Sequence, residues 1–212
     1  MTHYLIRAAA LLCCVLGLAG CATLGALNAA STPGDAYELR PPPNAPRAAS
    51  TQNVQLVIDV PTASGAIDTD RILVRPNASQ VQYLPGAQWT QAAPVMVQSV
   101  LVETFLRTGG FRFVGQRPIG PVGDILLVTH LSDFGVDIDP ASGQGTVVLS
   151  LTANLVREED AAILSSRRFS REARIEETTA PAIIAGFETV SNAVFSDLAG
   201  WVLRARGIPR RN

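Results

Sequence analysis

The C-terminal part of the chain carries the pattern that most restricts the fold. Apolar residues recur there at steps of three or four: Ile183, Phe187, Val190, Val194, Leu198, Trp201 and Ala205. This spacing puts them on one face of an α-helix of about six turns, because the helix repeats every 3.6 residues. Thr178 or Thr179 beside Pro181 is typical of a helix start, and Gly207 and Pro209 are typical of its end. A helix with one apolar face requires a second layer to cover it.

A second amphipathic helix is predicted to begin at Pro94, a residue that suits the first turn of a helix. Val97, Leu101 and Phe105 follow at steps of four, and the Gly109-Gly110 pair is typical of a helix end. The chain therefore has two main amphipathic helices.

The remaining patterned segments indicate β-strands. Residues 146–157 alternate between apolar and polar side chains, and residues 163–175 return after a polar turn as a hairpin partner. Residues 124–134 begin with a nearly continuous apolar run, which predicts burial on both faces. Shorter strands are predicted in segments 53–60, 71–75, 81–84 and 111–114, with a short edge strand at 37–39. We expect an α/β fold with one mixed sheet of about six strands.

The N-terminus has the three zones of a secretory signal. A short start with Arg7 precedes an apolar run over residues 8–18, which is shorter than the roughly 20 residues that span a bilayer. The closing Leu18-Ala19-Gly20-Cys21 resembles the lipobox of bacterial lipoproteins, which implies cleavage before Cys21 and attachment of diacylglycerol and palmitate-type acyl chains to it. The alternative is an ordinary secretory signal with an incidental cysteine. Ala22 stands where Asp favours inner-membrane retention, so the outer membrane is the expected site.

These signals divide the chain into four parts. Residues 1–20 are the predicted signal peptide, and residues 21–50 are the lipidated cysteine with a tether rich in Pro and Ala. Residues 51–207 form the expected domain, and residues 208–212 form a basic tail.

Composition excludes several functional classes. All 17 basic residues are Arg, so neither a Schiff-base lysine nor a phosphate-loop lysine exists. Cys13 and Cys14 leave with the signal and lipid occupies Cys21, which leaves no thiol for a disulfide or a metal. His130 is the one histidine after cleavage. We expect no metal, no cofactor and no nucleic-acid partner.

Two groups of charged residues have alternative interpretations. Asp68 and Asp70 are spaced for acid–base work, but turn hydrogen bonds and an ion pair with Arg71 are the favoured explanation. Basic residues gather in one late strand and at the C-terminus: Arg167, Arg168, Arg171, Arg174, Arg204, Arg206, Arg210 and Arg211. The first reading is a solvated strand and a frayed terminus, and the second is contact with anionic headgroups or an acidic partner.

One ordered set of motifs resembles the auxiliary lipoproteins of ABC-type transport systems. The set begins with Ile67-Asp68-Thr69-Asp70-Arg71-Ile72-Leu73-Val74-Arg75-Pro76, followed by Tyr83 and Trp89. Asp133-Phe134, the segment Ala185-Gly186-Phe187 and the closing Trp201 match in the same order. The departures are small, such as Ile67 in place of the usual Leu.

The resemblance implies a three-layer α/β sandwich and a role without catalysis. Such lipoproteins accompany a permease, an ATPase and a periplasmic protein with MCE (mammalian cell entry) domains, which together move phospholipids or other hydrophobic molecules between the two membranes. The family-motif residues expected to shape the domain or contact a partner are Asp68, Asp70, Arg71, Arg75, Tyr83, Trp89, Phe187 and Trp201. A homo-oligomer that matches the MCE ring is also expected.

Two other functions stay open. The chain could be an outer-membrane lipoprotein of another envelope machine, for secretion or lipopolysaccharide assembly. A lipid-modifying hydrolase would need a serine, His130 or Asp68 in a catalytic role, and no such grouping is evident.

Overall fold

The computed structural model describes residues 34–118 and 123–211. The signal peptide and Cys21 lie outside these residues. The strands are β1 (Asp35–Tyr37), β2 (Gln52–Ile58), β3 (Thr62–Ala63), β4 (Arg71–Asn77), β5 (Gln80–Trp89), β6 (Phe111–Gln116), β7 (Ile125–Ile138), β8 (Gly145–Arg157) and β9 (Ile163–Ile175). The helices are α2 (Ala93–Thr108) and α3 (Ala180–Ala205).

Strand β7 organises the sheet. On one side it pairs with antiparallel β8 along its whole length, and β8 pairs in turn with antiparallel β9. On the other side three strands follow one another along β7, all parallel to it: β2, then β3, then β4. Strand β6 extends the sheet beyond β2, and β5 with β1 extends it beyond β4.

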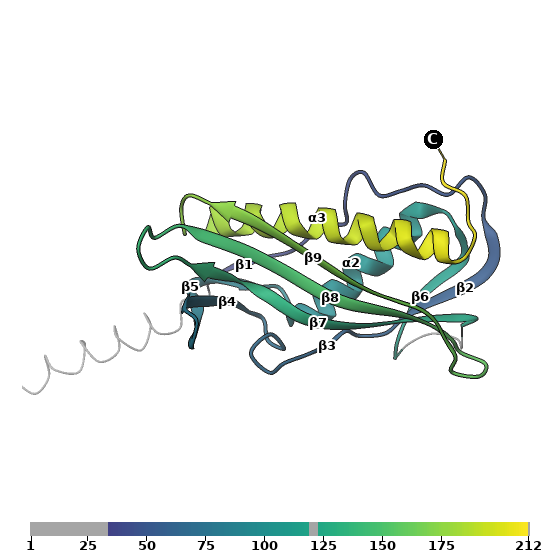
Figure 1. The fold of residues 1–212 in the computed structure, drawn as a ribbon, viewed down its shortest axis with the longest axis horizontal. Coiled ribbons are helices and arrows are strands. Elements are labelled where there is room, and N and C mark those ends of the chain that lie inside the picture. The colour runs from purple at the N-terminus through teal and green to yellow at the C-terminus, as the bar shows by residue number, and fades with distance from the viewer. Residues whose placement is uncertain (1–33, 119–122, 212) are drawn as a thin grey trace, which may run out of the picture. The chain divides into compact units, whose positions relative to one another are not determined.

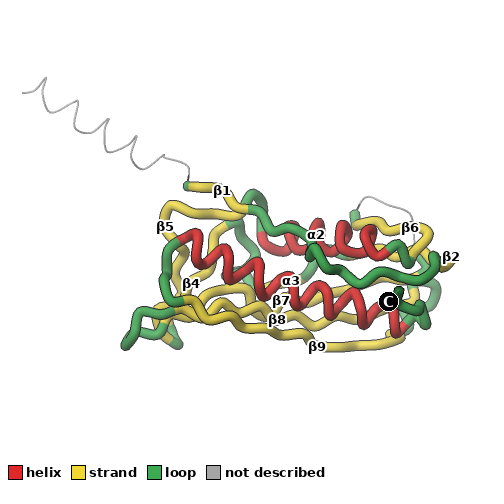
Figure 2. The backbone as a smooth tube through the Cα atoms, turned by 90° about the horizontal axis from the view of Figure 1, so that it is seen from above, coloured by secondary structure: helices red, strands yellow, loops and turns green. Residues whose placement is uncertain are grey.

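Both helices cover the same face of this sheet, as Figures 1 and 2 show. Helix α3 packs on β8 and β9, helix α2 packs on β6 and β2, and the two helices contact each other. The expected apolar faces are buried, with Val97, Leu101 and Phe105 of α2 all at 0% exposure. Thr179 precedes α3 as its N-cap, while Ala205, the last residue of the predicted face, is exposed.

The α/β class with one mixed sheet and two helices is confirmed. The sheet has nine strands where about six were expected, and β3, with only two residues, overlaps no predicted strand segment. Since both helices lie on one face, the described residues form two layers, where the resemblance implied three. Along β7, Leu126 and Val128 are half-buried and Ile125 and Leu127 are buried, so burial alternates where both faces were expected to be covered.

The second half of the expected tether lies in the domain. Strand β1 pairs with β5, and Leu39 is only 3% exposed. The amide of Ala48 donates to the carbonyl of Thr108 at 2.8 Å. The expected basic tail is also fixed, because Ile208 is 2% exposed and Arg210 forms a β-bridge with Ala48. The compact unit therefore begins at Asp35, and neither residues 35–50 nor the tail are separate from it.

Within the part of the chain that the structure describes, no helix is both long enough and apolar enough to cross a membrane.

Candidate functional site

The motif segment that begins at Ile67 forms the turn before β4 and continues into that strand. Asp68 and Asp70 are both exposed, and the turn is held mainly by backbone bonds such as Asp68 N–H to Ser64 O at 2.9 Å. The carbonyl of Asp70 accepts a 2.6 Å hydrogen bond from the amide of Trp89, which ties this turn to the end of β5. Both residues lie in a turn, but among the described residues the Asp68 carboxylate accepts no hydrogen bond and the Asp70 carboxylate accepts one from the Thr69 hydroxyl at 3.3 Å. The expected ion pair with Arg71 does not form there either.

Arg71 contacts an aromatic ring in place of a carboxylate. Its guanidinium carbon lies 3.8 Å from the centroid of the Tyr83 ring, on the adjacent strand of the β4–β5 hairpin. The Tyr83 hydroxyl donates to the carbonyl of Ala66 at 3.4 Å, so both the face of the ring and its hydroxyl group have a partner. A cation over an aromatic face is stabilising by about 0.5–1 kcal/mol at an exposed position. Two motif residues therefore form one surface feature.

Arg75 lies between two carboxylates of β7. Its Nη2 donates to Asp133 Oδ1 at 2.9 Å and its Nε donates to Asp137 Oδ1 at 2.5 Å. Burial alone would lower the pKa of Arg75, but the hydrogen bonds and negative charges of Asp137 and Asp133 outweigh it, so its pKa is raised above its usual value. The side chain links β4 to β7 at the position where Arg75 and Asp137 are register partners.

The other motif residues are aromatic and belong to the core. Trp89 of β5, Phe134 of β7 and Phe187 of α3 form a cluster with ring centroids 4.7–5.5 Å apart. Trp201 lies further along α3, 5.7 Å from the ring of Phe169 on β9. Each of these contacts joins an element of the sheet to another strand or to α3.

Most of the predicted site residues therefore stabilise the fold through ion pairs or aromatic packing. Arg71 and Tyr83 form a contact at the surface. Sequence reasoning missed Asp137, because its partnership with Arg75 depends on the β4–β7 register and not on local spacing. Open grooves of 440–510 Å³ occur in the described part, and these are lined by none of the family-motif residues predicted for the site, although Arg171, Arg174 and Arg206 of the basic groups each line one.

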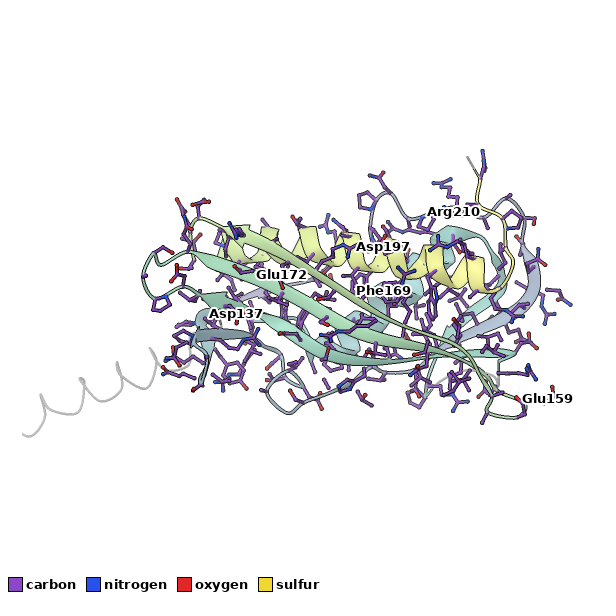
Figure 3. All side chains as sticks on the ribbon, viewed as in Figure 1. Asp137, Glu159, Phe169, Glu172, Asp197 and Arg210 are labelled. Atoms are coloured by element: carbon purple, nitrogen blue, oxygen red, sulfur yellow. The ribbon has the colours of Figure 1, made fainter. Side chains whose placement is uncertain are left out.

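The late strand and the C-terminus differ in how their arginines are held. On β9, Arg171 forms an ion pair with Asp197 of α3, and Arg167 lies over the ring of Phe169. Figure 3 labels Asp197 and Phe169. At the C-terminus the amide of Arg211 donates to the carbonyl of Arg47 at 2.7 Å. The described end of the chain is therefore ordered against the domain, where a frayed terminus was one expectation.

The described residues contain no arrangement of side chains typical of a catalytic site. The Nδ1 atom of His130 lies 2.9 Å from the hydroxyl of Thr62, and its other neighbours provide no carboxylate partner. Within ranges 34–118 and 123–211 no group of three or more His, Cys, Asp or Glu residues is placed to hold a metal ion.

The chain is similar in sequence and fold to known proteins. A family model described as "ABC-type transport auxiliary lipoprotein component" matches residues 37–199. A solved protein of Xanthomonas campestris is similar, with 27% identity and a TM-score of 0.68 over 80% of this chain and 93% of that one. A second solved, uncharacterized protein shares the fold, with a TM-score of 0.59 over 81% of this chain and 97% of its own at 14% identity.

One curated relative is an uncharacterized protein of Bradyrhizobium diazoefficiens. It is 26% identical over 181 residues, which cover 80% of this chain and 45% of the relative. The chain therefore spans less than half the length of that relative.

Proposed function

Because the chain belongs to the family of ABC-type transport auxiliary lipoprotein components, we propose that it serves a transporter that moves phospholipid or other hydrophobic molecules between the inner and outer membranes. The match over residues 37–199 carries this proposal, since it includes most of α3 and every motif segment except the closing Trp201. The partners would be a periplasmic MCE-domain protein, a permease and an ATPase, and the lipoprotein would act at the outer-membrane end.

The role is proposed to be docking without catalysis. Of the motif residues, Arg75, Trp89 and Phe187 are occupied in packing or ion pairs within the domain. Arg71 and Tyr83 form a motif pair that a partner can reach, because Arg71 is exposed and Tyr83 is half-buried at the surface, next to the exposed Asp68 and Asp70. Arginine and tyrosine are both favoured at protein interfaces. We assign this pair to the contact with the MCE-domain protein, directly or within a ring of several copies.

Attachment to the membrane is proposed through lipid on Cys21. The domain begins at Asp35, so the intervening chain reaches at most about 45 Å when fully extended, at about 3.3 Å per residue. Two or three acyl chains anchor a protein stably, because each buried CH₂ contributes about 0.8 kcal/mol. The anchor would hold the domain near the periplasmic face of the outer membrane.

Purification of a C-terminally tagged copy from native membranes in mild detergent, with mass spectrometry of the bound proteins, tests this function. We expect an MCE-domain protein with its permease and ATPase. The Arg71→Glu variant should lose them, and Arg112→Glu, an exposed arginine on β6, serves as the control. Recovery of a secretion or lipopolysaccharide-assembly complex without any MCE-domain protein would overturn the proposal and favour the second envelope function.

A further inference from the structure

The face of the sheet opposite the helices carries a row of polar side chains that crosses four strands. Thr62 of β3 pairs with His130 of β7, His130 lies opposite Thr152 of β8, and Thr152 lies opposite Arg168 of β9. The residues next to three of them along the chain are buried on the helix side: Leu131, Leu151 and Phe169. Since successive side chains of a strand alternate between faces, the row points to the uncovered side.

The histidine of the row, which lies next to Thr62 at one end, is held by one ring nitrogen. Its Nδ1 lies 2.9 Å from the Thr62 hydroxyl, which leaves Nε2 without a hydrogen-bond partner in the described residues. When the threonine hydroxyl donates to Nδ1, the ring proton is on Nε2 and is available to a ligand. His130 is exposed, so this donor is accessible.

The arginine at the other end is held in a similar way. Its Nε donates to the hydroxyl of Ser150 at 3.1 Å, and the Ser132 hydroxyl donates to the same oxygen at 3.2 Å. Ser150 is only 2% exposed, so its hydroxyl holds the Arg168 side chain from a buried position. The terminal nitrogens of Arg168 remain available, because this exposed side chain forms no ion pair within the described part of the chain.

A hydroxyl group lies between these two donors. Thr152 makes no side-chain hydrogen bond among the described residues and lies between His130 and Arg168 in the row. His130 and Arg168 are two strands apart, roughly 10 Å between backbones. One phosphate group with a hydrogen bond of about 2.8 Å on each side has the size to bridge two side chains at this separation. Hydroxyl, imidazole and guanidinium groups together are typical partners of phosphate oxygens.

We propose that Thr62, His130, Thr152 and Arg168 form a binding row for the phosphate group of a phospholipid headgroup. A negative charge nearby would oppose this binding, and one carboxylate on the same face is Asp133, opposite Ser150. That carboxylate forms an ion pair with Arg75 at 2.9 Å, which Arg75 shares with Asp137. The row is inferred from geometry, and its assignment to a transported lipid rests on the proposed function.

The test is a titration of the full lipidated chain in dodecyl maltoside with dihexanoylphosphatidylglycerol, followed through the ring signals of selectively ¹³C-labelled histidine. We expect a saturable shift of the His130 signal, which is the one histidine signal of the cleaved chain and should be absent from the spectrum of His130→Gln. Arg168→Gln should weaken binding about tenfold, which is the loss of one charge-assisted hydrogen bond. Thr152→Val should weaken it by a smaller factor.

Arg174→Gln is the matched control, because Arg174 is an exposed arginine on the same face of β9 but outside the row. Its affinity should stay within about twofold of the unsubstituted chain. Loss of binding in both arginine variants alike, or no saturable shift at all, overturns the proposal. Equal affinity for inorganic phosphate overturns the lipid assignment in favour of free phosphate. These results are independent of partner purification, so failure here leaves the proposed function standing.

Discussion

Trp89 packs edge-on against Phe187, with ring centroids 5.1 Å apart and ring planes at 83°. One residue ends β5 and the other lies in the first half of α3, so a single contact joins the hairpin side of the sheet to the helix layer. Trp89 is 1% exposed and Phe187 is fully buried. The two motif residues therefore stabilise the fold on which any partner surface depends.

Removal of the Trp89 indole is expected to destabilise the domain strongly. Trp89→Ala should lower the free energy of unfolding by about 3–5 kcal/mol, because it deletes a large buried side chain and leaves a cavity. Trp89→Phe keeps an aromatic ring and should cost clearly less. Urea denaturation of both variants measures the difference, and equal stability of the two would contradict this role for the ring.

The ion pair between Arg75 and Asp133 is expected to be coupled in energy. Arg75→Gln leaves Asp133 and Asp137 close to each other without a positive charge, which should cost about 1–3 kcal/mol. Asp133→Asn should recover part of that loss when combined with it, since it removes one of the two repelling charges. A double-mutant cycle measures the coupling. Strictly additive effects would show that the pair does not contribute as a unit.

Two glycines of α3 are predicted to respond in opposite directions to alanine. A Cβ on Gly186 would lie 2.6 Å from the Cγ2 atom of Val147 on β8, so Gly186→Ala should destabilise by about 1–3 kcal/mol. The nearest atom to a Cβ on Gly200 would be the flexible end of Arg204, at 3.4 Å. Gly200→Ala should therefore stabilise by up to about 1 kcal/mol through helix propensity. Thermal unfolding compares the pair, and the same sign for both would refute the packing argument.

The turn between β7 and β8 is expected to loosen in acid. Hydrogen bonds from the Ser142 hydroxyl and the Ala141 amide lower the pKa of Asp139 below 3.8. The folded-state pKa is thus below the unfolded value, so the carboxylate stabilises the turn above about pH 4 and this contribution is lost as the pH falls further. Amide exchange at Ala141, compared between wild type and Asp139→Asn, tests this. A difference that persists unchanged at pH 2 would contradict it.

Elements with long, regular patterns were predictable from the sequence. Helix α3 and the β8–β9 hairpin have the expected bounds to within a few residues, because one period continues over many positions. Strand β3 was missed because its two residues carry no period of their own and are ordered by pairing with His130 and Leu131. The segment from Asp35 to residue 50 has a proline-rich composition typical of a tether, and its tertiary contacts override that composition.

The candidate site was predictable only in part. Motif residues could be named from the resemblance, but their separation into a buried cluster and the exposed Arg71–Tyr83 pair depends on strand register. The row that includes Thr152 and Arg168 carries no sequence motif, since its members come from four strands and meet only in the sheet.

Movement of labelled phospholipid between the two membranes tests the transport account most directly. Cells that lack this protein are compared with cells that carry the unsubstituted chain, Cys21→Ser or Arg71→Glu. The account predicts slower exchange without the protein, full recovery with the unsubstituted chain, and no recovery with a chain that lacks its lipid anchor or its docking arginine. Equal exchange in all four strains would contradict a role in lipid transport.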